Sequence, residues 1–336
     1  GKCELRSRRW DRHLSELGSG QRRVGIRWAP NPGRVWRRTS TLRRLAMRRS
    51  SLALAGLGAT ALVGALWGVT AERTRFQLRR ETVPILDAGS DPIKILHLSD
   101  LHVAPWNTSA ISWIRALAES EPDLVVGTGD FFGHPESLPA ITEALLPLAG
   151  IPGVVTHGSN DRVAPRWNNP LAYLLAPSKP GASEGIPLDF AGLTHLYTEV
   201  LGWTDIDNSA VRVSINGSTL DFVGVGDANH GLDDLDHLPG TVEALRESEE
   251  GHSRPHHSIT TIGVTHAPYR RVLDAFVTQG AEAIFAGHTH GGQVCLPGGH
   301  ALTTNCDLPL DQASGLSIWR HAQRSSYLEV SAGLGT

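Results

Sequence analysis

Carboxylate, imidazole and amide side chains recur at five places along the chain, each where a short apolar run ends. They are Asp100 and His102, Asp130, Ser159 and Asn160, His266, and His288 and His290. Carboxylates bind hard divalent cations, and neutral imidazoles bind Mn, Fe and Zn. An aspartate between two such cations can bridge them, and two ions about 4 Å apart can clamp a phosphoryl group. The residue types therefore predict a centre of two divalent metal ions that acts on phosphate esters.

Alternating strands and helices are predicted to position these side chains. Strands are predicted at residues 93–98, 123–126, 154–156, 259–264 and 283–285, and helices at 108–118, 139–148 and 269–277. Each group of candidate ligands follows one of these strands. Because the carboxyl ends of strands in α/β sheets meet at one crevice, we expect the five groups to surround one point. His97 alternates away from Asp100 within the first strand and is predicted to be packed in the core.

The later part of the chain adds a hairpin to this alternation. Further strands are predicted at 211–215, 220–225 and 327–330, and long loops at 164–192 and 229–257. Asn216-Gly217 between the first two of these strands is typical of a two-residue hairpin turn. Asp227, just after the hairpin, is predicted either to lie near the cleft or to cap a turn. The combination predicts a mixed sheet or two packed sheets with outer helices.

The order of the five groups resembles that of the calcineurin-like metallophosphoesterase superfamily. That family has the blocks D-x-H, G-D, G-N-H-[DE], a lone H and G-H-x-H, and the corresponding blocks here run from Asp100 to His290. The run GHTHGGQVCLP at 287–297 is similar to the membrane-associated bacterial branch of the family. The resemblance covers residues 92–336. It implies an α/β fold of two mixed β-sheets packed face to face with flanking helices, a four-layer sandwich.

The resemblance also implies a role for each residue of the blocks. The first metal would be held by Asp100, His102 and His290, the second by His266, His288 and the amide of the third block, with Asp130 bridging the two. In the family, a metal-bridging hydroxide attacks phosphorus in line. The implied protein is a metal-dependent phosphoric ester hydrolase with two divalent ions, Mn, Fe or Zn, and a phosphomonoester or phosphodiester substrate.

The third block departs from the family pattern. Gly158-Ser159-Asn160-Asp161 stands where the family has G-N-H-[DE], so that Asn160 takes the position of the His that assists the leaving group. We expect Asn160 to be the ligand, because an amide oxygen suits a hard metal better than a hydroxyl, with Ser159 as the alternative. His157 or His134 would replace the missing acid. The alternative function is a non-catalytic metal- or phosphate-binding module that has lost this His.

The net charge of −3 conceals a strong asymmetry. Residues 1–50 hold 15 of the 31 basic residues but only 3 of the 34 acidic ones. Such a segment is typical of a tail at a membrane or a nucleic acid, and nucleic acid is not expected because no binding motif accompanies it. The apolar fraction of 40% excludes wholesale disorder, and three cysteines exclude a disulfide scaffold. Cys295 and Cys306 could form a disulfide or remain two separate thiols, and the sequence leaves both possibilities open.

A stretch of uncharged residues, 52–70, follows the basic segment. A helix of this length would measure about 28 Å, close to the roughly 30 Å of a hydrocarbon core, so residues 52–70 are the expected membrane contact. The excess of arginines before the stretch places the following residues on the extracytoplasmic face, either anchored or exported. A phosphate ester of lipid or cell-envelope origin is therefore an expected substrate, and the oligomeric state is left open.

Four segments result from these patterns. They are a basic, disordered extension at 1–46, a transmembrane anchor or signal segment at 47–71, a linker at 72–91 and a metallophosphoesterase domain at 92–336. The only methionine is Met47, so a chain that starts there, without the extension, is a further interpretation.

Overall fold

The computed structural model describes residues 75–164, 185–247, 259–292 and 300–334, together with six isolated positions. The continuous stretches belong to one compact unit, Leu66–Thr336. The predicted extension at 1–46 and, apart from four isolated positions, the predicted membrane segment at 47–71 lie outside the described residues. Within the part that is described, no helix has the length and apolar character needed to cross a membrane.

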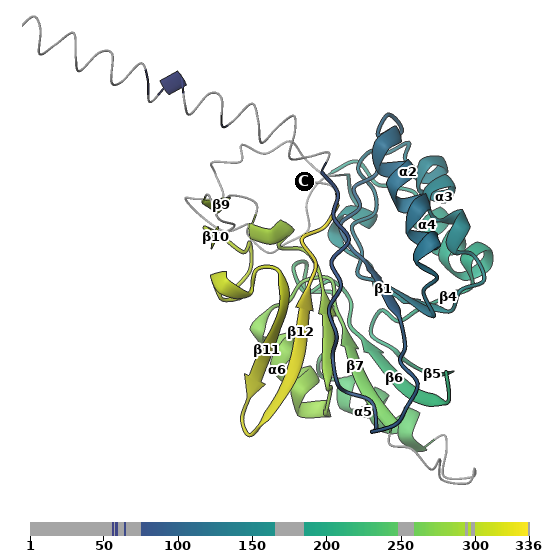
Figure 1. The fold of residues 1–336 in the computed structure, drawn as a ribbon, viewed down its shortest axis with the longest axis vertical. Coiled ribbons are helices and arrows are strands. Elements are labelled where there is room, and N and C mark those ends of the chain that lie inside the picture. The colour runs from purple at the N-terminus through teal and green to yellow at the C-terminus, as the bar shows by residue number, and fades with distance from the viewer. Residues whose placement is uncertain are drawn as a thin grey trace, which may run out of the picture. The chain divides into compact units, whose positions relative to one another are not determined.

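One sheet of the described unit consists of parallel strands in sequential order (Figure 1). Its members are β1 (Ile95–Leu98), β2 (Leu124–Gly127), β3 (Gly153–Val155) and β4 (Trp203–Asp205). All three pairings between neighbours are parallel. The expectation that both sheets are mixed is therefore wrong for this one. Each of its strands returns to the sheet through a helical crossover, which makes neighbouring strands parallel.

The second sheet is mixed, as predicted. In spatial order it contains β11 (Gly315–His321), β12 (Arg324–Val330), β8 (Ala283–Ala286), β7 (Ile259–Val264), β6 (Ser218–Gly224) and β5 (Ala210–Ile215). The inner pairs are parallel, and the pairs at both edges are antiparallel hairpins. Asn216 and Gly217 form the turn between β5 and β6 with φ of 48° and 76°. These values are those of the type I′ turn that Asn-Gly favours. A small ribbon pairs β9 (Cys295–Leu296) with β10 (His300–Ala301).

The helices among the described residues lie on the outer faces of the two sheets. They are α2 (Thr108–Ala116), α3 (Leu138–Leu145), α4 (Phe190–His195), α5 (Leu238–Glu247) and α6 (Arg270–Gln279). Short helical turns are η2 (Leu117–Ser120), η3 (Leu146–Leu148), η4 (Ser159–Asp161), η6 (Leu196–Leu201), η7 (His290–Gly292) and η8 (Leu310–Gln312). Helix α5 lies inside the predicted loop at 229–257. It buries only Leu238 and Val242 of its ten residues, so few apolar residues mark it as a helix in the sequence.

Three apolar clusters fill the spaces between neighbouring layers. The first joins the parallel sheet to α2, α3 and α4, and the second joins the mixed sheet to α5 and α6. The third lies between the two sheets and contains Leu124, Val126, Val154, Leu220, Phe222, Ile262 and Val264. The order of layers is therefore helices, sheet, sheet, helices, and the fold is an α/β sandwich.

The segment before β1, predicted as a linker, packs against the body of the unit. Ile85 and Leu86 join the cluster between the sheets, and Thr260 Oγ1 donates to the Ile85 carbonyl over 3.2 Å. No regular helix or strand forms over the described residues 75–91. Among the described residues Cys306 is a free thiol, so Cys295 and Cys306 do not form a disulfide with each other.

Candidate metal centre

The candidate ligands lie on the loops that follow the carboxyl ends of the strands, as predicted. Five of them have positive φ: Asp100 (47°), His102 (38°), Asp130 (60°), His288 (69°) and His290 (50°). Residues other than glycine rarely adopt this left-handed conformation, because it costs energy. Such strained backbone is typical of functional sites, where the surrounding fold holds a side chain in one direction.

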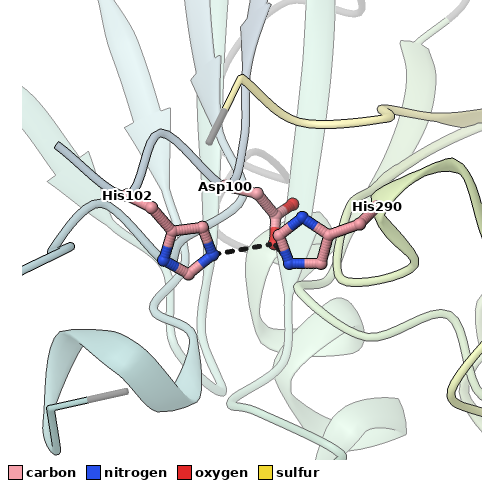
Figure 2. A group of neighbouring side chains, drawn as sticks. All are labelled: Asp100, His102 and His290. Atoms are coloured by element: carbon pink, nitrogen blue, oxygen red, sulfur yellow. Dashed lines mark ion pairs between the residues drawn. The ribbon is translucent and has the colours of Figure 1, made fainter. Parts of the chain in front are cut away.

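Asp100, His102 and His290 form a first group of side chains. His102 Nε2 and His290 Nε2 lie 4.0 and 3.5 Å from Asp100 Oδ1. The two imidazole rings stack with their centroids 5.1 Å apart, and Figure 2 shows the Asp100 carboxylate next to them. The group joins a loop of the parallel sheet to a loop of the mixed sheet. Its nitrogen and oxygen atoms are close enough to bind one cation.

Asp130 and His266 form a second group with Asp100. Asp130 Oδ2 lies 3.5 Å from His266 Nε2 and 3.7 Å from His102 Nε2. Asp130 therefore contacts one imidazole of each group, which is the position that a bridging ligand requires. The ring of His288 meets that of His266 edge-on, at 5.2 Å between centroids.

Hydrogen bonds from neighbouring backbone orient these side chains. His266 Nδ1 lies 2.7 Å from the Thr128 carbonyl, and His102 Nδ1 lies 3.2 Å from the Phe132 carbonyl. Because a carbonyl only accepts, each Nδ1 carries a proton, and each Nε2 is the nitrogen that remains to bind a metal. Asp100 Oδ2 accepts from Ser99 Oγ at 2.5 Å and from the His288 N–H at 2.9 Å.

Three buried polar atoms of the site have no hydrogen-bond partner among the described residues. They are Asp100 Oδ1, His266 Nε2 and His290 Nδ1. Buried polar atoms are nearly always paired, so such a set needs an explanation. One carboxylate oxygen and two imidazole nitrogens match the ligands of Mn, Fe or Zn. The residues present therefore fit a divalent cation.

The carboxylates and imidazoles of the site change one another's pKa values. Burial raises the pKa of Asp100, but the imidazoles of His290, His266 and His102 outweigh that effect and hold it at about 2. Burial lowers the pKa of His266, but Asp130 and Asp100 raise it to about 9. Burial lowers the pKa of His290 to about 4. Without a cation Asp100 thus stays ionised and His266 carries a second proton, on Nε2, which a cation that binds to this nitrogen must displace.

Two glycines allow the loops to approach each other at the site. A Cβ at Gly158 would overlap Asp130 Oδ1, and a Cβ at Gly287 would overlap Ser99 Oγ and Asp100 Oδ2. No other residue has room at these positions without moving a carboxylate.

The third block places Asn160 against Asp130. The Asn160 backbone N–H donates to Asp130 Oδ1 and its Nδ2 donates to Asp130 Oδ2, each over 2.7 Å. In the described contacts it is thus Asn160, rather than Ser159, that reaches the carboxylate between the two groups. Asp161 accepts N–H groups of Asp130, Phe131 and Gly158 over 2.7 to 2.9 Å. Sequence reasoning missed this role, because the partners of Asp161 are mostly about thirty positions away.

His157 and His134, the predicted acids, have different surroundings. His157 is buried, with its Nε2 3.1 Å from Asp205 Oδ2 and its ring against Phe190 and Tyr197. This environment is that of a packed histidine, and its role as an acid stays a prediction. His134 Nδ1 accepts the Glu136 N–H at 3.2 Å, and its ring meets that of the exposed Trp106. Its role also stays a prediction.

His97 is packed in the fold, as its position in the strand predicts. Its Nε2 is 3.0 Å from Thr128 Oγ1, and its ring meets Phe285 edge-on. Burial lowers the pKa of His97 from 6.5 to about 4, although Asp100 opposes this. Below pH 6.5 the unfolded chain therefore binds a proton that the folded chain does not, and stability falls as the pH drops toward 4.

Replacing His97 with Gln is expected to reduce this sensitivity to acid. Gln can still hydrogen-bond to Thr128 but does not titrate. Thermal midpoints of the metal-free wild type and of His97→Gln, measured at about pH 7 and about pH 5, test this. The wild type should lose more stability than the variant between the two values, and equal losses would contradict the expectation.

A metal-dependent hydrolase with an α/β sandwich fold is the class of protein that the layers and the buried carboxylate–imidazole cluster indicate. The chain belongs to the calcineurin-like phosphoesterase family, whose profile matches residues 93–292. This confirms the family that the five blocks indicate, and supports a phosphoester hydrolase. Members of this family generally depend on divalent metals.

Individual proteins are also similar to this chain. The phosphodiesterase YaeI of Escherichia coli (strain K12) is 26% identical over 227 residues, which cover 66% of this chain and 69% of YaeI. Two solved structures also align, TT1561 of Thermus thermophilus and the NAD nucleotidase NadN of Haemophilus influenzae. Each is 11% identical with a TM-score of 0.41. The first alignment covers 73% of this chain and 91% of the other, and the second covers 72% and 51%.

Proposed function

We propose that the chain is a binuclear metal-dependent phosphodiesterase. The observation that carries this proposal is the position of Asp130, whose Oδ2 lies within 3.7 Å of His102 Nε2 and 3.5 Å of His266 Nε2. A carboxylate beside ligands of both groups suits a pair of cations that share it. The similarity to a protein named a phosphodiesterase supports a diester rather than a monoester as the substrate.

The chain's own residues would hold the two ions and fix their surroundings. One ion would be held by Asp100, His102 and His290, the other by His266, His288 and Asn160, with Asp130 between them. When bound, two such cations lower the pKa of water and neutralise the charge on phosphoryl oxygens. The carbonyls of Thr128 and Phe132 keep the imidazoles oriented, so that the ligand atoms do not need to rearrange.

The location of the enzyme is part of the proposal. The uncharged stretch 52–70 and the arginines before it support an anchored or exported protein with its site on the extracytoplasmic face. A phosphodiester from lipid or from the cell envelope is the substrate class that such a location favours.

Metal content and turnover, measured together on the full chain, test the proposal. Protein loaded with Mn²⁺ and freed of excess metal should hold about two ions per chain. It should hydrolyse bis-p-nitrophenyl phosphate faster than p-nitrophenyl phosphate, and chelation should abolish both activities. Two bound ions without turnover would favour the alternative of a binding module, with Asn160 in place of the usual His as its cause. Absence of bound metal would contradict the site itself.

A further inference from the structure

The loop that follows β6 carries a second carboxylate–imidazole pair, Asp227 and His230. Asp227 is buried, and its Oδ2 lies 2.8 Å from His230 Nδ1 while its Oδ1 accepts the Asn229 N–H at 2.9 Å. The His230 side chain is 19% exposed. Because Nδ1 donates to the carboxylate, Nε2 is the nitrogen that remains to face a ligand.

The topology places this pair beside the candidate metal centre. Strands β6 and β7 are parallel neighbours with Gly224 opposite Val264, and the Val225 N–H donates to the Val264 carbonyl. Asp227 and His266 therefore leave adjacent strand ends on the same edge of the sheet. The Asp227 charge raises the pKa of His266, and the Asp130 charge raises that of His230, as expected for charges near these imidazoles.

Hydrogen bonds hold the loop in one conformation. Asn208 Oδ1 accepts the N–H groups of Gly226 and Asp234, and Asn208 Nδ2 donates to the Leu232 carbonyl. The Tyr269 hydroxyl donates to Asn229 Oδ1 over 3.0 Å. A side chain on such a loop is positioned in advance of binding, which proton transfer requires.

We propose that His230, oriented by Asp227, is the general acid that replaces the His missing from the third block. The step rests on the proposed phosphodiesterase function. Water attacks phosphorus and releases one proton to solvent, a new P–O bond forms, and the P–O bond to the leaving group breaks. The electron pair stays on the leaving oxygen, which takes the proton from His230 Nε2. The imidazole becomes neutral and regains a proton from solvent before the next turnover.

The charges around His230 favour the protonated form that this step needs. The groups whose charges act on it are Asp227, hydrogen-bonded on its own loop, Asp130 on the loop after β2 and His266 after β7. The hydrogen bond to Asp227 raises the pKa of His230, burial opposes it, and His266 also lowers it. The two carboxylates outweigh the opposing effects, so the pKa of His230 lies above its ordinary value.

The dependence on the leaving group distinguishes an acid from a structural residue. Mn²⁺-loaded full chain and its His230→Gln and His230→Ala variants are compared on bis-p-nitrophenyl phosphate and on diphenyl phosphate. Phenol is the weaker acid and therefore the poorer leaving group. Each variant should lose about 100-fold or more in kcat on the phenyl ester and much less on the p-nitrophenyl ester. Metal content should stay at the wild-type level.

Asp227→Asn and His237→Ala complete the experiment. Asp227→Asn should lower the His230 pKa, read by NMR titration of the imidazole in metal-free protein, and should shift the descending limb of the pH–kcat profile to lower pH. His237 forms the same type of pair with Asp234, three positions apart, but is 83% exposed, so His237→Ala should leave both esters unaffected.

Each outcome of this comparison bears on the proposal. Equal losses on the two esters, or none, with an active wild type would overturn the role of His230 and leave the proposed function intact. An inactive wild type that binds metal would overturn both.

Discussion

Replacing Asp130 with Asn is expected to lower kcat/KM for bis-p-nitrophenyl phosphate by about 1,000-fold or more. Asp130 carries the negative charge between the two groups of ligands, and its Oδ2 lies 3.5 Å from His266 Nε2 and 3.7 Å from His102 Nε2. An amide in its place can offer only one oxygen and no charge to a pair of cations. The bound metal per chain should therefore fall together with the rate.

A measured rate is informative only if the variant is folded. Asn at position 130 would turn an NH₂ group toward Asn160 Nδ2 or Asn160 N–H, both of which now donate to the carboxylate. A modest loss of stability is thus expected, and circular dichroism with a thermal scan should separate it from the loss of activity. Asp236→Asn, an equivalent change on an exposed aspartate, serves as the control. Wild-type turnover in the folded Asp130→Asn variant would contradict the proposed centre.

Replacing Asp161 with Ala is expected to have the largest effect on stability. The buried carboxylate accepts three backbone N–H groups, from Asp130, Phe131 and Gly158. Its removal leaves these donors buried without a partner, at a cost of about 3 kcal/mol or more. For a chain of this size the thermal midpoint should fall by about 6 °C. The loops after β2 and β3 should lose their alignment, so that metal binding weakens as well.

Two further variants make this comparison specific. Asp161→Asn keeps one acceptor oxygen and should lose less stability than Asp161→Ala. Asp189→Ala removes an exposed aspartate that caps α4 by accepting one backbone N–H, from Gly192, and should cost only about 1 kcal/mol. Urea unfolding of the four proteins provides the free energies. If Asp161→Ala cost no more than Asp189→Ala, the three hydrogen bonds would not stabilise the site in the way described.

The parts of the fold that could be predicted from the sequence are those with a strong local signal. Leu124–Gly127 is continuously apolar and forms a strand buried on both faces, and Asn216-Gly217 forms the turn that its residue types favour. The parts that escaped prediction depend on distant partners. Strand β11 is mostly half-exposed and is stabilised by pairing with β12, whereas β4 is three residues long and completes the edge of the parallel sheet.

The same division applies to the candidate site. The order of the blocks is enough to predict that Asp100, Asp130 and His266 converge, because the carboxyl ends of strands in α/β folds meet at one crevice, although the sequence does not show that two sheets supply them. Asp161 stands at the [DE] position of the third block, but that position does not reveal its role, and His230 carries no local signal at all. The first is identified only by hydrogen bonds to residues about thirty positions earlier, and the second only by the proximity of β6 to β7.

The candidate centre draws its ligands from both sheets, and this has a consequence for when it can form. Asp100, His102 and Asp130 follow strands of the parallel sheet, while His266, His288 and His290 follow strands of the mixed sheet. As the chain is synthesised from its N-terminus, the parallel sheet is complete at Asp205, about 60 residues before the first of these histidines exists. The first half of the growing chain thus contains Asp100, His102 and Asp130 but not the later histidines that complete the ligands of the centre. Loading with metal must be one of the last events in the maturation of this protein.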